Sequence, residues 1–149
     1  MHYYGTFHQR LDAKGRVALP ARLREQLAER DQRRLVVTGW EYAVWLYGLD
    51  EWRQLLEAAA RMPAQDRAVA TFNRYFFAHA AEVEPDGQGR ILVPGTLREY
   101  AGLTKEVVVA GVFRRIEIWD RARWEAARPA TEQDYDRINT ALADYDLPL

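Results

Sequence analysis

Cysteine is absent from the 149 residues of this chain, and histidine occurs only three times. No apolar run approaches the roughly 18 residues that a membrane-spanning helix needs. Without cysteine the chain can form neither a disulfide framework nor a thiolate metal site. The first residues, Met-His-Tyr-Tyr-Gly, also lack the basic and apolar regions of a signal peptide. These absences predict a soluble intracellular protein with no membrane partner.

Signatures of catalysis are missing as well. His2, His8 and His79 share no metal-ligand spacing, and the chain has no Gly-rich phosphate loop, nucleophile elbow or cysteine nucleophile. Asp12 and Asp86 could be paired carboxylates, but each has a turn to stabilise and an arginine four residues later that keeps it ionised. We therefore predict no enzyme activity, no cofactor, no metal and no small-molecule substrate.

The net charge of −1 does not favour non-specific binding to nucleic acid. The charges are unevenly distributed, however. Residues 1–30 carry six Lys or Arg against three acids, whereas residues 131–149 carry five acids against Arg137 alone. A basic face is therefore compatible with the neutral total, and the end of the chain is an acidic tail.

The sequence contains an internal repeat. Residues 12–27 read DAKGRVALPARLREQL, and residues 86–101 read DGQGRILVPGTLREYA. Seven positions are identical at an offset of 74, namely Asp12/Asp86, Gly15/Gly89, Arg16/Arg90, Pro20/Pro94, Leu23/Leu97, Arg24/Arg98 and Glu25/Glu99. The similarity continues to Trp52 and Trp124 at an offset of 72, so we place two extra residues in the polar stretch 29–34.

The repeat divides the chain into four parts. Copy one covers residues 5–52 and copy two covers residues 79–124, with a helical connection at 53–78 and the acidic tail at 125–149. A unit of about 45 residues is marginal for folding alone, so we expect the two copies to fold together.

Each copy is predicted to run strand, turn, strand, helix, strand pair, helix. Gly15 and Gly89 stand where a tight turn needs a positive φ, and Asp12 and Asp86 can accept backbone amides within these turns. The prolines at 20 and 94 suit the first turn of a helix. The outward face of the first helix carries arginines, Arg24 among them.

The remaining elements follow from apolar spacing and capping residues. Asp50 and Asp120 are placed as N-caps of the closing helices. The predicted strands are 4–11, 35–38, 43–47 and 79–85, and the predicted helices are 20–30, 50–61, 65–78, 120–128 and a last one around 135–142. Aromatic residues of the helix 65–78 should pack on the closing helix of copy one.

The Asp-x-x-x-Arg turns admit two interpretations. In one, Asp12 and Asp86 pair with Arg16 and Arg90 only to hold the hairpins. In the other, the planar fork of each arginine is aimed outward at phosphate oxygens or guanine edges. Spacing alone leaves both open. Lys14 is an exposed cation that glutamine replaces in copy two, so the two turns are not equivalent.

These residues carry a family resemblance. The motifs are Leu11-Asp-Ala-Lys-Gly-Arg16 with Leu19-Pro20, Gln88-Gly-Arg-Ile-Leu-Val-Pro94, and Leu97-Arg-Glu-Tyr-Ala-Gly-Leu103. Together they resemble the MraZ family, bacterial regulators with two SpoVT/AbrB-type repeats. The resemblance covers nearly the whole chain outside the acidic tail. It implies an α+β fold with a mainly β core, in which the repeats interleave as a swapped-hairpin AbrB-type β-barrel with connecting helices.

The resemblance also implies a function. Members of the family regulate transcription of the division and cell-wall gene cluster, lie on the nucleoid in the cytoplasm, and bind short direct repeats in their own promoter as homo-oligomeric rings. The DNA-contacting residues of the family fall here on Asp12, Arg16, Asp86 and Arg90, with Lys14 beside them. The partners expected are therefore double-stranded DNA and further copies of the chain itself.

Two other hypotheses are kept. AbrB-type barrels also occur in antitoxins, which bind a toxin through an added tail, and the tail of this chain is short. Alternatively, the chain is a ring-forming scaffold whose basic turns are only solvated surface. A gel shift with the DNA upstream of its own gene separates these hypotheses from the DNA-binding one.

Overall fold

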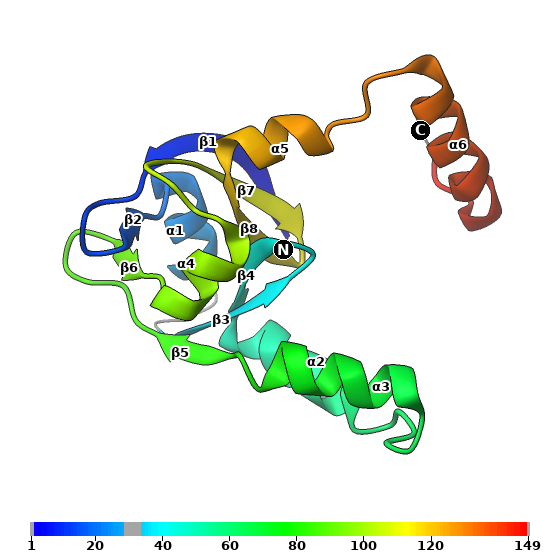
Figure 1. Cartoon of the computed structure of the whole chain (residues 1–149), viewed down its shortest axis with the longest axis horizontal. Helices are drawn as coiled ribbons and strands as arrows, with labels where there is room; N and C mark the ends of the chain where they lie inside the picture. The colour runs from blue at the N-terminus through cyan, green and yellow to red at the C-terminus, as the bar shows by residue number, and fades with distance from the viewer. Residues whose placement is uncertain (1, 29–33, 149) are drawn as a thin grey trace.

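The computed structural model describes residues 2–28 and 34–148. Apart from Arg34, the stretch predicted to hold the two extra residues of copy one lies outside the described residues. Figure 1 shows a β-rich body from which two helical parts project. Within the described residues, no helix is both long and apolar enough to cross a membrane.

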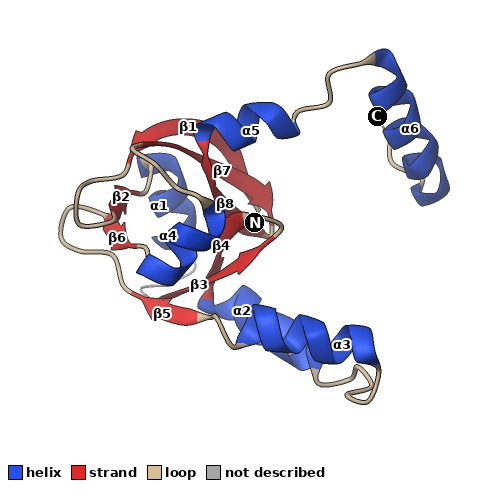
Figure 2. Ribbon diagram, in the orientation of Figure 1, coloured by secondary structure: helices blue, strands red, loops and turns tan. Residues whose placement is uncertain are grey.

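Antiparallel strands form most of the body (Figure 2). Six of them make one sheet in the order β1-β7-β8-β4-β3-β5, while β2 and β6 pair as a separate ribbon. The bounds are β1 Tyr3–Arg10, β2 Arg16–Ala18, β3 Leu35–Trp40, β4 Ala43–Gly48, β5 Ala81–Val83, β6 Arg90–Leu92, β7 Glu106–Phe113 and β8 Arg115–Asp120. With the helices around them, these strands confirm the α+β class and its mainly β core.

Strands of the two copies alternate in the pairing. β1 pairs with β7, β4 with β8, β3 with β5 and β2 with β6, and each of these pairs joins copy one to copy two. Pairing within one copy occurs in the hairpins β3–β4 and β7–β8. Most of the ladder hydrogen bonds of either copy therefore depend on the presence of the other.

The strand pairs of the described residues do not close into a barrel. β1 and β5 form the two edges of the sheet, and the β2–β6 ribbon is a sheet of its own. A single bridge between Leu11 and Val17 links the end of β1 to the ribbon. The closed barrel expected from the family resemblance is thus not confirmed by this pairing.

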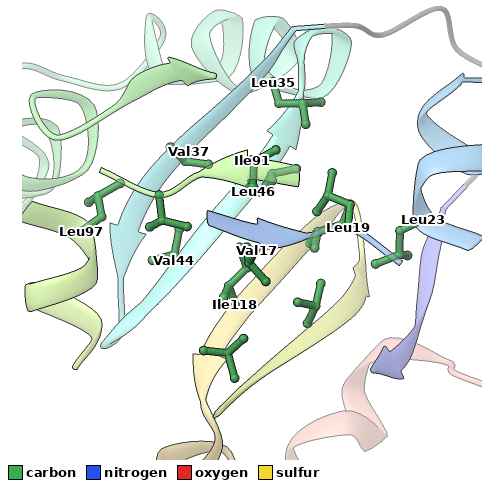
Figure 3. Packing of buried hydrophobic residues seen from close by; sticks show 14 of the residues in the cluster. Val17, Leu19, Leu23, Leu35, Val37, Val44, Leu46, Ile91, Leu97 and Ile118 are labelled. Carbon is green, nitrogen blue, oxygen red and sulfur yellow. The ribbon is translucent and has the colours of Figure 1, made fainter. Parts of the chain in front are cut away.

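The core is built from equivalent positions of the two copies. Val17 and Ile91 are fully buried, as are Leu23 and Leu97 of the helices α1 (Ala21–Ala28) and α4 (Gly95–Ala101). Figure 3 shows Val17 and Ile91 of the ribbon lying over Val44, Leu46 and Ile118 of the sheet, with Leu97 at one end of the cluster and Leu23 at the other. Full burial of one such aliphatic side chain stabilises the fold by about 1.5–3 kcal/mol. The helices begin at the residues that follow Pro20 and Pro94, close to the predicted positions.

The connection between the copies is an aromatic helical arm. It consists of α2 (Leu49–Ala59), α3 (Arg67–Phe72) and a π-helical turn (Asn73–Phe77). Trp52 of α2 stacks on Phe76 with ring centroids 5.8 Å apart, and Phe72 stacks on Phe76 at 4.7 Å. The predicted packing of these aromatics on the closing helix of copy one is confirmed.

Three sequence predictions about this region need correction. The helix expected over 65–78 changes to a π turn, and the wider turn brings Phe72, Phe76 and Phe77 together. The strand expected over 79–85 is only β5, because His79 still belongs to the turn that ends the arm. Asp50 is not an N-cap, since α2 begins one residue earlier and Gly48 occupies that position.

The carboxyl-terminal part begins with α5 (Arg121–Ala127), whose N-cap is Asp120 as predicted. The Asp120 carboxylate, however, accepts hydrogen bonds from Thr104 and makes no cap bond to α5. The last predicted helix is confirmed as α6 (Glu132–Leu142), which starts with a capping box between Thr131 and Asp134. Figure 1 shows α6 standing apart from the body.

The first prediction tests the dependence of the copies on each other. Residues 1–62 expressed alone should be unfolded or should pair with a second copy of the fragment, because β1, β2 and β4 lose their partners β7, β6 and β8. Circular dichroism and sedimentation equilibrium would measure this. A monomeric fragment that melts cooperatively would contradict the prediction.

Candidate nucleic-acid interface

The first Asp-x-x-x-Arg turn joins β1 to β2 and is held by one carboxylate. Oδ1 of Asp12 accepts hydrogen bonds from the backbone N–H groups of Lys14, at 2.9 Å, and Arg16, at 2.8 Å. Oδ2 accepts from Nε of Arg16 at 2.8 Å. Gly15 has a φ of 85°, the left-handed conformation predicted for it. One side chain therefore fixes both the turn and the direction of its arginine.

The second turn, between β5 and β6, repeats this geometry. Oδ1 of Asp86 accepts from the backbone N–H groups of Gln88 and Arg90, both at 2.9 Å. Oδ2 accepts from Nε of Arg90 at 2.9 Å, and Gly89 has a φ of 75°. Asp, Gly and Arg are the same in both copies, and Lys14 and Gln88 contribute only backbone N–H groups, so the same local chemistry produces the same turn.

Both carboxyl groups are held in the ionised form. The backbone N–H of Arg16 is the main cause of a lowered pKa at Asp12, and that of Arg90 has the same effect at Asp86. Bonds to the arginine side chains lower the pKa further, since each favours the carboxylate over the acid. Each Asp thus presents a fixed negative charge to its arginine.

The arginines keep donors for a ligand. An Arg side chain has five N–H donors, and the ion pair with Asp uses Nε alone. No acceptor among the described residues takes a hydrogen bond from the terminal nitrogens of Arg16 or Arg90. Each of these two side chains is 31% exposed. The arrangement presents two pre-oriented guanidinium forks, the geometry that suits phosphate oxygens and guanine edges.

Each turn is hydrogen-bonded to the residue just before the helix proline of the other copy. The backbone N–H of Val93 donates to the carbonyl of Gly15, and that of Leu19 donates to the carbonyl of Gly89, both at 2.9 Å. Figure 1 shows the two turns projecting on the same side of the body. We call these contacts the cross-copy contacts.

Arg24 and Arg98 complete the cross-copy contacts. Nε of Arg24 donates to the carbonyl of Leu19, and Nε of Arg98 donates to that of Val93, both at 3.0 Å. A Cβ atom on Gly15 would lie 2.5 Å from Cζ of Arg98, and one on Gly89 would lie 2.7 Å from Cδ of Arg24. The arginine of each copy therefore packs against the turn of the other.

Sequence reasoning missed this role of Arg24 and Arg98. The prediction placed Arg24 on the outward face of its helix, where it indeed lies exposed, but gave it no partner. The signal that could have found the pair is the identity of the two positions in both copies.

The remaining predicted site residue is Lys14, at the tip of the first turn. Its side chain is exposed, and its backbone N–H is one of the two that Asp12 accepts. The turns that carry Lys14, Arg16 and Arg90 project on one side of the body (Figure 1), and Asp12 and Asp86 hold the two arginines through their Nε atoms. Among the described residues, no group of three His, Cys, Asp or Glu side chains could hold a metal ion.

The fold and these turns define a protein of two interleaved repeats, each of which presents an Asp–Arg turn on a shared edge. Comparison with known proteins identifies its relatives. A family model described as "MraZ protein, putative antitoxin-like" matches twice, at residues 3–75 and 76–141. The chain belongs to the MraZ family, as the resemblance predicted.

Three curated relatives share one name, and each matches this chain over most of its length. A "Transcriptional regulator MraZ" of Acetivibrio thermocellus is 45% identical over 124 residues, which are 83% of this chain and 85% of the relative. Proteins of the same name from Moorella thermoacetica and Pediococcus pentosaceus are each 39% identical over 145 residues, 97% of this chain and 99% of the relative.

The second prediction concerns Gly15. Gly15→Ala should destabilise the fold by more than about 1 kcal/mol, because alanine is strained at positive φ and its Cβ would overlap the guanidinium of Arg98. Gly87→Ala is the matched control, since nothing lies within 4 Å of a Cβ there. Urea unfolding of both variants measures the difference. Equal stability of the two would show that Arg98 and the turn are not packed as described.

The third prediction concerns acid. Folding lowers the pKa of Asp12 and Asp86, so their ionised forms stabilise the fold above the unfolded pKa of about 3.9 and cease to do so as the pH falls through the folded value. The wild type should therefore lose stability relative to the Asp12→Asn, Asp86→Asn double variant below about pH 4. Urea midpoints between neutral pH and about pH 3 measure this. A difference that is independent of pH would contradict it.

Proposed function

We propose that this chain is a sequence-specific DNA-binding regulator of transcription. The observation that carries the proposal is the pair of Asp-clamped arginines, Arg16 and Arg90, whose turns project on one side of the body and whose terminal N–H groups are available. The names of its relatives support a regulatory role. In this proposal Arg16, Arg90 and Lys14 contact double-stranded DNA, and Asp12 and Asp86 hold the arginines in place.

The finer proposal follows the family resemblance. The regulated genes are those of the division and cell-wall cluster, the operator is a set of short direct repeats in the promoter of the chain's own gene, and the protein works on the nucleoid in the cytoplasm. The geometry of the two turns supports binding to DNA.

A ring of identical chains would supply the affinity that one chain lacks. With a net charge of −1 and about three cations at the turns, one chain binds DNA weakly at physiological salt. Further turns brought alongside by neighbouring subunits bind as an intramolecular step, which can raise affinity by about 10²–10⁴. Operator repeats then lie about 10 base pairs apart, so that successive subunits meet one face of the duplex.

We also propose that the strands form a barrel. The bridge between Leu11 and Val17 and the bond from the N–H of Asp86 to the carbonyl of Arg90 tie the segments that follow the edge strands β1 and β5 to the ribbon. We assign this arrangement to the swapped-hairpin barrel of the AbrB type, with copies at 5–52 and 79–124, a connection at 53–78 and a tail at 125–149.

An antitoxin-like interaction module is the second candidate. It is favoured by the family description and by α6, which stands apart from the body with Tyr135 and Ile138 exposed. In that case a protein partner binds at the tail, and the turns are a solvated surface. A ring-forming scaffold without DNA specificity is the remaining alternative. Both alternatives predict that the arginines of the turns can be removed without loss of the interaction concerned, which is binding of the protein partner in one case and assembly of the ring in the other.

The fourth prediction separates these functions. Arg16→Ala or Arg90→Ala should abolish the gel shift of duplex DNA from the region upstream of the chain's own gene, while the mass of the oligomer stays unchanged. Arg53→Ala on α2 is the matched control, because it removes the same charge from an exposed side chain of the arm.

The same experiment tests the ring. Insertion of about 5 base pairs between operator repeats should weaken binding, since it turns successive sites to opposite faces of the duplex. Full binding by a verified monomer, or indifference to the spacing, would show that the ring does not supply the affinity. Full binding by the Arg16→Ala and Arg90→Ala variants would refute the proposed function itself.

A further inference from the structure

Although the two turns share one geometry, the charges beside them differ. We call β1, its turn and β2 the first hairpin, and β5, its turn and β6 the second hairpin. At the offset of 74 that relates the copies, the first hairpin has His8, Arg10 and Lys14 where the second has Glu82, Glu84 and Gln88. All six side chains belong to exposed residues. The first hairpin is therefore basic where the second is acidic, although the Asp–Arg clamp is the same in both.

Two further cations lie directly beside the first turn. Arg10 is the last residue of β1 and is exposed. The backbone N–H of the next residue, Leu11, donates to the carbonyl of Lys105 at 2.9 Å, which places Lys105 next to the entrance of the turn. Among the described residues, neither Arg10 nor Lys105 has a carboxylate within 4.0 Å of its charged group.

The acid nearest in register to Arg10 is already paired. Glu106 faces Arg10 across the β1–β7 ladder, and its carboxylate lies 3.4 Å from Nη1 of Arg121. Arg10, Glu106 and Arg121 line one hollow of about 420 Å³. The positive charge of Arg10 is therefore not neutralised locally.

The second hairpin has the opposite character. Glu84 lies two residues before Asp86, at the position that Arg10 holds in the first hairpin. Glu82 lies 3.9 Å from Arg34, and both of these side chains are largely exposed. A DNA strand that passes the second turn meets Arg90 but also the carboxylate of Glu84, and like charge repels phosphate.

We infer that Arg10 and Lys105 are additional phosphate-contacting residues and that the first hairpin carries most of the backbone contact with DNA. This inference rests on the proposed function and adds an orientation to it. Each chain binds the duplex with its first hairpin, rather than its second, against the phosphates. Phosphate contacts position a protein on DNA without reading the sequence. Arg10 and Lys105 therefore contribute affinity for any duplex, and Glu84 reduces it.

The test uses a fluorescein-labelled duplex of random sequence and fluorescence anisotropy across a salt series. Arg10→Ala and Lys105→Ala should each lower the slope of log K against log salt by about 1 and weaken binding roughly fivefold at about 0.15 M salt, since each phosphate contact contributes about 0.9 to the slope. Glu84→Arg should strengthen binding and steepen the slope. Arg53→Ala is the control with the same charge change away from the turns and should alter neither quantity.

The outcomes separate the inference from the proposed function. If Arg16→Ala weakens binding while Arg10→Ala and Lys105→Ala retain the wild-type Kd and slope, the inference is wrong and the proposed function stands. If Arg53→Ala weakens binding as much as Arg10→Ala does, the effect is general charge, and the inference is again wrong. A wild-type protein that binds no duplex under any salt condition overturns both.

Discussion

The cross-copy contacts are the constraint on which the rest of this structure depends. The carbonyl of each turn glycine accepts a hydrogen bond from the residue before the helix proline of the other copy, and an arginine of that copy packs against the glycine. Neither turn is therefore a property of its own copy. The interleaved strand pairs lead to the same arrangement, because β2 and β6 meet only when the two copies are assembled.

The proposed function depends on the fixed geometry that these contacts give the two turns. Asp12 and Asp86 stay ionised, accept two backbone amides each, and hold Nε of an arginine. A guanidinium that is already oriented loses less side-chain freedom on binding, a cost of about 0.5–1.5 kcal/mol for each mobile side chain that an interface immobilises. In the proposed function the clamp holds both arginines ready for DNA, and we infer that the charges beside the clamp set how strongly each hairpin attracts it.

Local chemistry explains what the sequence could predict. A glycine at a positive-φ position, an aspartate that accepts amides up to four residues ahead, and a proline before a helix each act on residues close to them in the chain. The turns and their Asp–Arg bonds were therefore readable from the motif. The internal repeat predicted the order of strands and helices along each copy, and the family resemblance predicted that the two copies interleave.

The features that sequence reasoning missed depend on contacts between distant residues. Arg24 reaches a turn that follows it by some 65 positions in the chain, so no local pattern reveals the contact. The π turn of the arm arises where Phe72 and Phe76 stack beside Trp52, and it shortens the strand that follows. Asp50 resembled a cap by residue type, but the end of β4 sets the start of α2 one residue before it.

The most direct measurement of the central claim, that each turn is held by the other copy, is an amide ¹H–¹⁵N spectrum of the Arg98→Ala variant. The substitution lies in copy two. It should shift the amide signals of Lys14 and Arg16 in the turn of copy one and leave those of Gln88 and Arg90 in its own copy nearly unchanged. Shifts confined to Gln88 and Arg90 would contradict the account.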